Sequence, residues 1–248
     1  MKNLSKSVFL SVAVASALAA SAVAEQNGVF LGAEVGYGGA SVEDRSNYDE
    51  RPMTQAPRST PTLKYNGGGV KYGIIAGYKQ FFTPYLGLRY YASLSAMHAS
   101  LSTSQIEGEW KNVSATMINY GANVDFLGNF IAQENLDFGG FVGLGIGGTS
   151  WLGKNINDYQ KLVDGYGYGW KLSKNSFDVA LNVGLRANIA KNHGVEIVAR
   201  VPFLPTKLID KSRTEPYNVG ADTYLATATR KDSLHHPYSI TARYTFSF

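Results

Sequence analysis

All charged side chains in eight segments of this chain occupy one of the two faces that an extended strand presents. In each segment, alternate residues are apolar and the residues between them are mostly small or polar. This period-two alternation predicts β-strands with one apolar and one polar face. The eight segments are residues 29–38, 70–79, 86–95, 118–126, 136–147, 177–188, 195–203 and 238–248.

Eleven charged residues lie on the polar face within these segments, and none lies on the apolar face. A lysine or arginine that faces lipid at mid-depth costs about 2–4 kcal/mol, so the segregation predicts that the apolar face contacts lipid. The polar face then lines the barrel interior, where the charges form a lumen network whose partners depend on the barrel shear. These residues are Glu34, Lys71, Lys79, Arg89, Asp125, Asp137, Asp178, Arg186, Glu196, Arg200 and Arg243.

The chain begins with the features of a secretory signal peptide. Lys2 and Lys6 precede an uncharged apolar core over residues 8–20, which is followed by the small-x-small sequence Ala22-Val23-Ala24. The core is too short to span a bilayer as a helix. We therefore expect a signal peptide over residues 1–24 and a membrane barrel over residues 25–248.

Strand length and export together favour a membrane barrel over a soluble β-protein. A soluble β-protein shows the same alternation with its apolar face toward the core and its polar face toward water. That interpretation does not explain the signal peptide or the strand length of ~9–13 residues. Backbone amides cannot stay unpaired in lipid, so the strands must close on themselves. The predicted fold is all-β, a transmembrane antiparallel up-and-down β-barrel of eight strands in the cell outer membrane.

Composition excludes several other classes. The chain has no cysteine, so no disulfide stabilises the fold. Its formal net charge of +4 falls to +2 when Lys2 and Lys6 are removed, which is too small for a nucleic-acid footprint. No later segment has the ~18 uncharged apolar residues of a transmembrane helix.

The expected connections alternate between short and long. Short connections are predicted at residues 83–84, 127–135 and 190–194, and long ones at residues 39–69, 98–112, 150–175 and 204–237. Short periplasmic turns and long extracellular loops are typical of outer-membrane barrels. The first long loop contains Pro52, Pro57 and Pro61 and is expected to be irregular. In the third, the sequence GYGYGW at residues 165–170 can extend a hairpin beyond the membrane.

The last strand carries an expected assembly signal. The chain ends on Phe248, with Phe246 and Tyr244 at alternate positions before it. A terminal aromatic residue on such a strand is what the bacterial barrel-assembly machinery recognises, which makes that machinery an expected partner.

Six segments of the chain carry a resemblance to a known family. They are residues 72–82 (YGIIAGYKQFF), 87–91 (GLRYY), 119–125 (NYGANVD), 148–151 (GTSW), 182–186 (NVGLR) and 202–206 (PFLPT). In these segments the chain resembles the Helicobacter outer-membrane protein family, among its small members that consist of the barrel alone. The resemblance implies an outer-membrane barrel in a family that includes both pore-formers and host-binding adhesins. Adhesive members usually carry a large extracellular insertion, which is absent here.

One glycine motif resembles a nucleotide-binding loop. Gly143, Gly145 and Gly148 match the spacing G-x-G-x-x-G, but that motif needs a following helix to hold phosphate. Here it lies within a predicted strand, so we expect inward glycines that leave room for long neighbouring side chains, and no cofactor.

Two groups of residues have catalytic or metal-binding side chains. The first is His98 with Ser95, Ser100 and Ser102, but His98 falls on the lipid-facing side. In the second, His235 and His236 are adjacent residues that point apart in an extended chain, and no third metal ligand is evident. The other members of the second group are Asp232 and Ser239. We expect neither an enzyme nor a metal site.

A third group is aromatic and lies near the strand ends. We interpret it as part of the aromatic girdle at the membrane interfaces. Its members are Tyr65, Tyr78, Tyr85, Tyr90 and Trp151.

The leading functional hypothesis is an integral outer-membrane barrel with a structural or surface-interaction role and at most a narrow pore. Eight strands leave a lumen just wide enough to be filled by side chains, here Arg89, Arg186, Arg200 and Arg243. A porin for small solutes or ions is the alternative, favoured if the barrel has ten or more strands. A second alternative is a loop-mediated adhesin with a host surface receptor as partner. In each case the barrel contacts outer-membrane lipid and lipopolysaccharide.

Overall fold

The computed structural model describes residues 27–49, 58–59 and 62–248. The expected signal peptide over residues 1–24 lies outside these ranges, as do the three prolines of the first loop, Pro52, Pro57 and Pro61. In the described part of the chain, no helix has the length and apolar character needed to cross a membrane.

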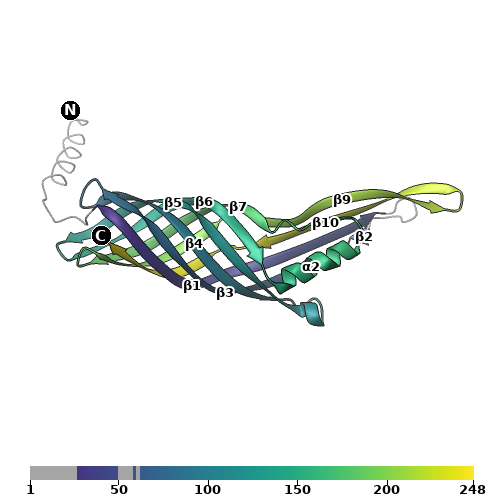
Figure 1. The fold of residues 1–248 in the computed structure, drawn as a ribbon, viewed down its shortest axis with the longest axis horizontal. Helices are drawn as coiled ribbons and strands as arrows, with labels where there is room; N and C mark the ends of the chain where they lie inside the picture. The colour runs from purple at the N-terminus through teal and green to yellow at the C-terminus, as the bar shows by residue number, and fades with distance from the viewer. Residues whose placement is uncertain (1–26, 50–57, 60–61) are drawn as a thin grey trace, which may run out of the picture.

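The described part of the chain is dominated by strands, and it contains one helix and one 3-10 turn (Figure 1). The elements are β1 (Gly28–Asp49), β2 (Arg58–Ser59), β3 (Leu63–Phe81), β4 (Leu86–Ser102), η1 (Glu109–Lys111), β5 (Asn112–Gln133), β6 (Leu136–Leu152), α2 (Lys154–Gly165), β7 (Asn175–Ile189), β8 (His193–Pro202), β9 (Thr206–Val219), β10 (Asp222–His235) and β11 (Ser239–Ser247).

Eight strands close into a ring, as the sequence predicts. Antiparallel pairing runs from β11 through β8, β7, β6, β5, β4 and β3 to β1, and β1 pairs back to β11. The closing register runs from Phe30 opposite Ser247 to Gly38 opposite Ser239. Closure gives every strand of the ring two neighbours, so no strand edge is left unpaired in lipid.

A belt of exposed apolar side chains surrounds this ring. On β1 the belt runs from Val29 to Tyr37, with Val35 57% exposed, while Glu34 between them is buried. Ile74 of β3 and Ile197 of β8, both 61% exposed, continue the belt around the barrel. Nine residues that rise ~3.3 Å each and tilt ~40° cover about 23 Å along the membrane normal, near the ~25 Å of outer-membrane barrels. The predicted lipid face is therefore the outer surface.

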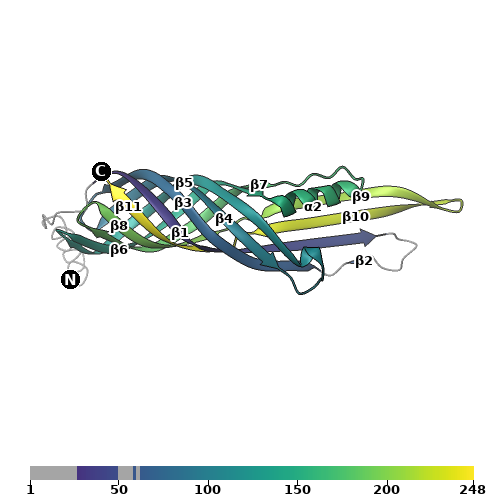
Figure 2. The same ribbon diagram turned by 60° about the horizontal axis from the view of Figure 1, so that its bottom comes forward.

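The strands of the wall continue beyond the belt of exposed apolar side chains. Beyond the belt, the outer half of β1, residues 41–49, pairs with β10, whereas its inner half pairs with β11. The β9–β10 hairpin thus continues the β8–β11 pair beyond the membrane, as the long extension in Figures 1 and 2 shows. The strands occupy much of the ranges expected as loops, notably in residues 39–69 and 204–237. The ten-strand alternative is wrong, because β9 and β10 lengthen the wall without widening the ring.

Helix α2 replaces the hairpin expected in the third long connection. Ile156 and Val163, seven residues apart, lie on one helical face and are buried, which explains why residues 154–165 form a helix. Gly167 and Gly169 then have φ angles of 71° and 67°, so the chain turns where a strand was expected. The hairpin beyond the membrane comes from the fourth connection instead.

The short connections differ in length from the sequence prediction. Residues 82–85 join β3 to β4, where residues 83–84 are expected, and residues 190–192 join β7 to β8, where residues 190–194 are expected. Strands β5 and β6 pair up to Gln133 and Leu136, which leaves a two-residue turn in place of the connection expected at residues 127–135. The register shifts by one residue between Asn129 and Ile131, so a bulge absorbs the break in alternation there.

A charge on the belt should destabilise the barrel. Replacing Ile197 by Arg places a guanidinium against lipid near mid-depth and should lower the free energy of unfolding by about 2–4 kcal/mol. The matched control is Leu225→Arg on β10, because Leu225 is 59% exposed but lies outside the belt. Urea titrations of the two variants refolded into vesicles should separate them, and equal stability would mean that the belt is misplaced.

The C-terminal strand provides a second prediction. Phe248 is 68% exposed at the end of the barrel, and its ring contacts Phe246 edge-on at 5.2 Å. Deleting Phe248 should reduce the amount of heat-modifiable barrel in the outer membrane, while Phe248→Tyr should preserve it. Both proteins should still refold in detergent, because the deletion removes one backbone hydrogen bond, from Phe248 to the carbonyl oxygen of Val29, and leaves the other pairs between β11 and β1 in place. A normal cellular level of the deletion variant would contradict this role.

Candidate functional site

The barrel interior holds all eleven charged residues singled out on the polar strand faces. Each is at most 9% exposed, and together they line the lumen from the periplasmic end to the outer rim of the belt. Lys79, Asp137 and Arg186 lie toward the periplasmic end of their strands. The remaining eight lie nearer mid-depth or the outer end of the lumen, and they form ion pairs with one another there.

Arg243 of β11 bridges two neighbouring strands at mid-depth. Its Nη2 atom lies 2.8 Å from Oε2 of Glu34 on β1, and its Nη1 atom lies 3.3 Å from Oε2 of Glu196 on β8. Both partners occupy the positions directly opposite Arg243 in the strand register. Lys71 of β3 adds a second cation to Glu34, at 3.5 Å from Oε1.

Arg89 of β4 connects opposite walls of the barrel. Its Nη2 atom lies 2.7 Å from Oδ2 of Asp125 on the adjacent strand β5, and its Nη1 atom donates to Oε1 of Glu196 on β8. Strands β4 and β8 are four places apart in the ring of eight, so they face each other across the lumen. The pair Arg89–Glu196 therefore crosses the centre of the barrel.

A second polar layer lies toward the outer end of the lumen. Arg200 of β8 donates to Oδ2 of Asp178 at 2.7 Å and to Oδ1 of Asn123 at 3.1 Å. Asn182 also donates to Asn123 Oδ1, at 3.1 Å, and Asn119 donates to Asp178 at 2.8 Å. These bonds join β5, β7 and β8 at a second level, so the lumen is occupied by more than one layer of side chains.

Aromatic rings pack around the central arginines. The guanidinium of Arg89 lies 4.7 Å from the ring centre of Phe141 and 5.2 Å from that of Tyr91. Arg243 also stacks on Tyr91, at 5.2 Å. Such contacts stabilise a desolvated cation, so these rings belong to the lumen network. Sequence reasoning did not single them out, although both rings lie on the polar face of their strands, a position that indicates contact with the interior.

The glycines of the G-x-G-x-x-G spacing lie beside this network. A Cβ atom on Gly143 would lie 2.1 Å from Asp125 Oδ1, and one on Gly145 would lie 2.7 Å from Arg200 Nη1. Side chains at these positions would collide with the charged groups. The glycines therefore provide space for long side chains from neighbouring strands, and they sit within β6, with no following helix N-terminus at Gly148.

The two groups of histidines and hydroxyls are not assembled into a triad. Ser95 is buried in the interior, whereas His98 is exposed on the outer surface and bonds to Thr116 at 3.1 Å. His236 bonds to the carbonyl oxygen of Gly39 at 2.8 Å, and His235 bonds to Ser233 at 3.0 Å. Within residues 27–49, 58–59 and 62–248, no three His, Cys, Asp or Glu side chains are grouped so that they could hold a metal ion.

Two residues assigned to the aromatic girdle lie inside the molecule. Tyr65 is 7% exposed and Trp151 is 1% exposed, whereas Tyr78, Tyr85 and Tyr90 are 37–42% exposed on the outer surface. The girdle assignment of Tyr65 and Trp151 is wrong, because their strands continue past the belt and the interior becomes apolar there. The indole nitrogen of Trp151 donates to Thr206 at 3.1 Å.

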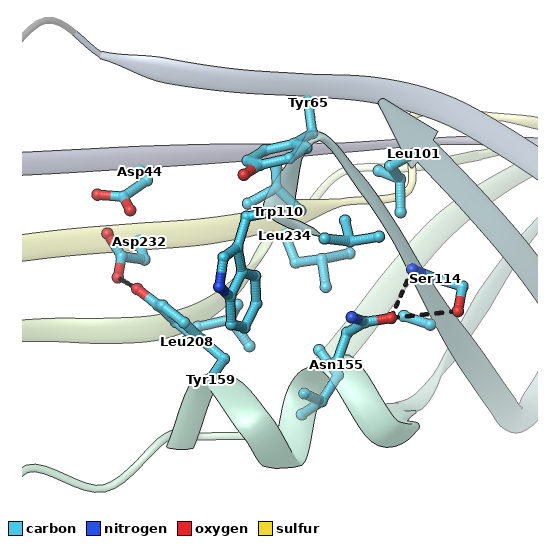
Figure 3. A pocket seen from close by; sticks show the side chains of 14 residues that line it. Asp44, Tyr65, Leu101, Trp110, Ser114, Asn155, Tyr159, Leu208, Asp232 and Leu234 are labelled. Atoms are coloured by element: carbon cyan, nitrogen blue, oxygen red, sulfur yellow. Dashed lines mark hydrogen bonds between the residues drawn. The ribbon is translucent and has the colours of Figure 1, made fainter. Parts of the chain in front are cut away.

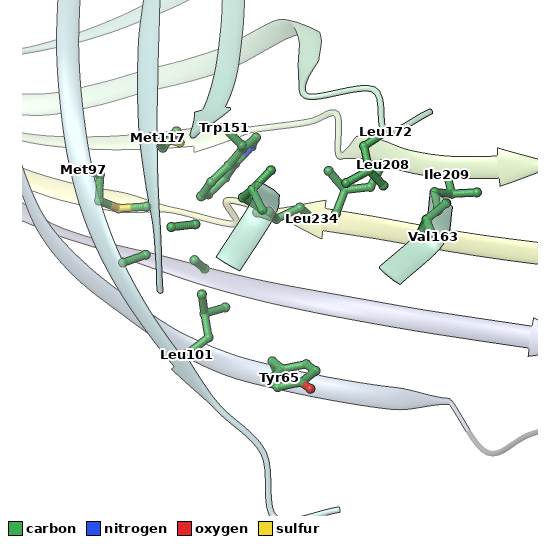
Figure 4. Close-up of a cluster of buried hydrophobic side chains, with 14 of the residues drawn as sticks. Tyr65, Met97, Leu101, Met117, Trp151, Val163, Leu172, Leu208, Ile209 and Leu234 are labelled. Atoms are coloured by element: carbon green, nitrogen blue, oxygen red, sulfur yellow. The ribbon is translucent and has the colours of Figure 1, made fainter. Parts of the chain in front are cut away.

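Trp151 belongs to an apolar cluster that fills the outer end of the barrel (Figure 4). The cluster includes Met97 and Met117, which are fully buried, and Val163 of helix α2. The sequence pattern does not predict this cluster, because it places residues 98–112 and 150–175 in loops. Its signal was nevertheless present, since the inward positions of β4 change from Ser95 to Met97, Ala99 and Leu101.

Comparisons with known proteins agree with this architecture. A family model described as Helicobacter outer membrane protein matches residues 73–248. No curated protein matches the chain.

Solved outer-membrane proteins are also similar to the chain. The crystal structure of OprG from Pseudomonas aeruginosa has 14% identity and a TM-score of 0.45, covering 92% of this chain and 100% of OprG. AlkL, solved in DMPC lipid bilayers, has 15% identity and a TM-score of 0.37, covering 93% of this chain and 95% of AlkL. Ail of Yersinia pestis has 13% identity and a TM-score of 0.31, covering 89% of this chain and 100% of Ail.

The central ion pair should show strong coupling. Replacing Arg89 by Leu leaves Glu196 and Asp125 buried with less compensation, and it should lower the free energy of unfolding by about 3–5 kcal/mol. Glu196→Leu should have a similar effect, while the double variant should lose less than the sum. Unfolding of all three proteins in urea completes the double-mutant cycle, and additive losses would contradict a direct pair across the lumen.

Proposed function

The chain belongs to the Helicobacter outer membrane protein family, and on that premise we propose that it is a closed barrel with a surface-interaction role. It is an outer-membrane β-barrel protein with a ring of eight strands. In this proposal the barrel anchors the extension that continues beyond the membrane and passes no bulk solute. Residues 1–24 act as a cleaved signal peptide, and the terminal aromatic residues serve assembly.

The proposal depends chiefly on the pair Arg89–Glu196, which connects opposite walls at mid-depth. A solute that passes this level has to separate two buried, oppositely charged groups. Separation leaves each charge in a medium of low dielectric constant, which costs several kcal/mol. Asp125 on the neighbouring strand also binds Arg89, and Arg243 on another neighbouring strand also binds Glu196. These second ion pairs restrain both side chains, so the pair Arg89–Glu196 does not move aside freely.

The size of the ring supports the same proposal. An eight-stranded barrel has an interior that side chains can fill, whereas aqueous porin channels require about twice as many strands. The polar layer around Arg200 and Asp178 adds a second obstruction nearer the outer end. The porin alternative would need a wider ring, and the β9–β10 hairpin does not provide one.

The β9–β10 hairpin is the element best suited to surface contact. Among the described strands β9 pairs with β10 alone. Its other edge is bonded at its base, where the N–H of Ser173 donates to the carbonyl oxygen of Leu208 at 2.9 Å, and no described strand lies beside it farther out. Pro216 and several charged residues along β9 protect this edge against indiscriminate strand pairing. Near the tip, Tyr217 and Tyr224 pack with ring centres 5.8 Å apart, and Leu225 is 59% exposed.

These features favour a loop-mediated contact as the form of surface interaction. Aromatic and apolar side chains at the tip provide contact area, and the polar body of the hairpin keeps them away from the membrane. The partner in this proposal is a macromolecule at the cell surface, with lipopolysaccharide and outer-membrane lipid surrounding the barrel itself.

Conductance tests the closed barrel. The purified, refolded protein in planar bilayers should show no steady channels, because the paired side chains block the lumen. A charge-balanced variant that combines Arg89→Ser, Glu196→Ser, Arg243→Ser and Glu34→Ser should open measurable channels. The matched control removes an exposed pair outside the membrane, Lys207→Ser with Asp210→Ser, and should stay closed. Large, steady wild-type channels would reject the proposal and favour the porin.

A further inference from the structure

A cavity of about 90 Å³ lies within the outer extension, beyond the membrane belt (Figure 3). Strands β1, β3, β4, β5, β9 and β10 and helix α2 contribute its walls. Asp44 marks its polar end, and it lies seven residues past Tyr37, the last belt residue of β1. At ~3.3 Å per residue this distance is about 23 Å along the strand, so the cavity faces the cell exterior.

Most of the wall is apolar. Leu101, Leu208 and Leu234 are buried side chains of the outer cluster, and Tyr65 closes one side. Trp110 of η1 extends into the space, and its ring meets that of Tyr159 edge-on at 6.4 Å (Figure 3). Specific small-molecule sites typically combine a concave apolar wall with a few placed polar groups. The leucine and aromatic side chains of this cavity form the apolar wall, and the polar groups lie at the end of the cavity marked by Asp44.

Two aspartates meet at that polar end. Asp44 of β1 and Asp232 of β10 occupy directly opposed positions in the register, where like charges repel. Arg230 lies between them, with Nη2 at 2.6 Å from Asp44 Oδ2 and Nε at 2.8 Å from Asp232 Oδ2. The hydroxyl of Tyr159 donates to the same Asp232 Oδ2 atom. One arginine therefore serves two carboxylates, which leaves one excess negative charge when both are ionised.

Asp232 has an oxygen atom without a partner. Its side chain is 1% exposed, and its Oδ1 atom has no hydrogen bond from the described residues, although Asp232 lines the cavity. A buried acceptor without a donor costs about 1–3 kcal/mol, and more when the acceptor is charged. A ligand that brings a donor to this atom recovers that cost.

The charge state of Asp232 depends on pH near neutrality. Burial raises the pKa of Asp232 to about 6, and the neighbouring Asp44 carboxylate acts in the same direction. The groups that face Asp232 are Asp44 on β1, Tyr159 on α2 and Arg230 on its own strand. Because the pKa of Asp232 in the folded protein lies above its ordinary value, the protein is more stable with Asp232 protonated than with Asp232 ionised. This contribution of protonated Asp232 to the stability of the protein is lost as pH rises through about 6.

We propose that this cavity binds a small primary amine: its ammonium group donates to Asp232 Oδ1 and its short alkyl chain packs among Leu101, Leu208 and Leu234. The ammonium neutralises the excess negative charge, and the ring of Trp110 offers a face that attracts a cation, whereas the guanidinium of Arg230 already lies over the ring of Tyr159 at 5.3 Å. Arg230 and Tyr159 both bond to Oδ2 of Asp232, so Oδ1 is the atom that lacks a donor among the described residues, and the cavity has room for the apolar part of the amine. The proposal does not depend on whether the barrel conducts.

The test compares two isosteric probes on the full refolded chain in a zwitterionic detergent. Isothermal titration at pH 7.5 should show that 3-methylbutylamine binds at least tenfold more tightly than 3-methylbutanol, because only the amine carries the charge. Asp232→Asn should lower the affinity for the amine at least tenfold and leave that for the alcohol unchanged. The control is Asp210→Asn on β9, an exposed aspartate outside the cavity, which should change neither affinity.

The wild-type protein gives a second measurement that needs no variant. Between pH 7.5 and pH 5, Asp232 becomes mostly protonated, so the affinity for the amine should fall by about tenfold. The affinity for the alcohol should stay constant over the same range. Equal affinities for the two probes, no binding of the amine to the folded wild-type protein, or full retention of amine binding by Asp232→Asn would each overturn the proposal.

Discussion

Hydrocarbon offers no hydrogen-bond partner to a peptide group, and this constraint governs the structure of the membrane part of the chain. The pairing of β1 with β11 satisfies it by closing the ring, so every strand of the ring is paired on both sides. Closure leaves the side chains only two environments, lipid outside and a narrow lumen inside. The alternation of Val35 and Glu34 on β1 follows directly, because neighbouring residues point to opposite environments.

A ring of eight strands brings the inward side chains within reach of one another. Arg89 reaches Glu196 across the lumen, and Arg243 joins Glu196 to Glu34 along the wall. Charges at such depth are tolerated when they are paired and hydrogen-bonded, so each arginine stabilises carboxylates from other strands. Gly143 and Gly145 belong to the same arrangement, since any Cβ atom there would occupy space that Asp125 and Arg200 use.

Beyond the belt the barrel wall is surrounded by water, so the inward side chains become apolar and the outward side chains no longer face lipid. The inward positions of β4 become apolar at Met97, and a core of the ordinary soluble kind forms around Trp151 and Val163. Helix α2 covers one side of this core, anchored by Asn155, whose Oδ1 accepts the backbone N–H of Ser114 at 3.0 Å. The cavity at Asp232 lies within this second core, where a buried carboxylate can face an external ligand. The chain thus combines a polar lumen within the membrane and an apolar core outside it.

The membrane strands, and the face on which each of their charges lies, could be predicted from the amino-acid sequence, because alternation with period two depends only on local geometry. The sequence also indicated the ring of eight, since the eight alternating segments are each long enough to cross a bilayer. The contact of Arg89 with Glu196 and the opposition of Asp232 and Asp44 became visible in the folded chain alone, because both depend on how strands distant in the sequence are placed against one another. The interior positions of Tyr65 and Trp151 also depended on the structure. Both residues continue the inward alternation of β3 and β6, but the sequence assigned them to loop ends, and only the folded chain shows that these strands extend beyond the belt and surround an apolar core there.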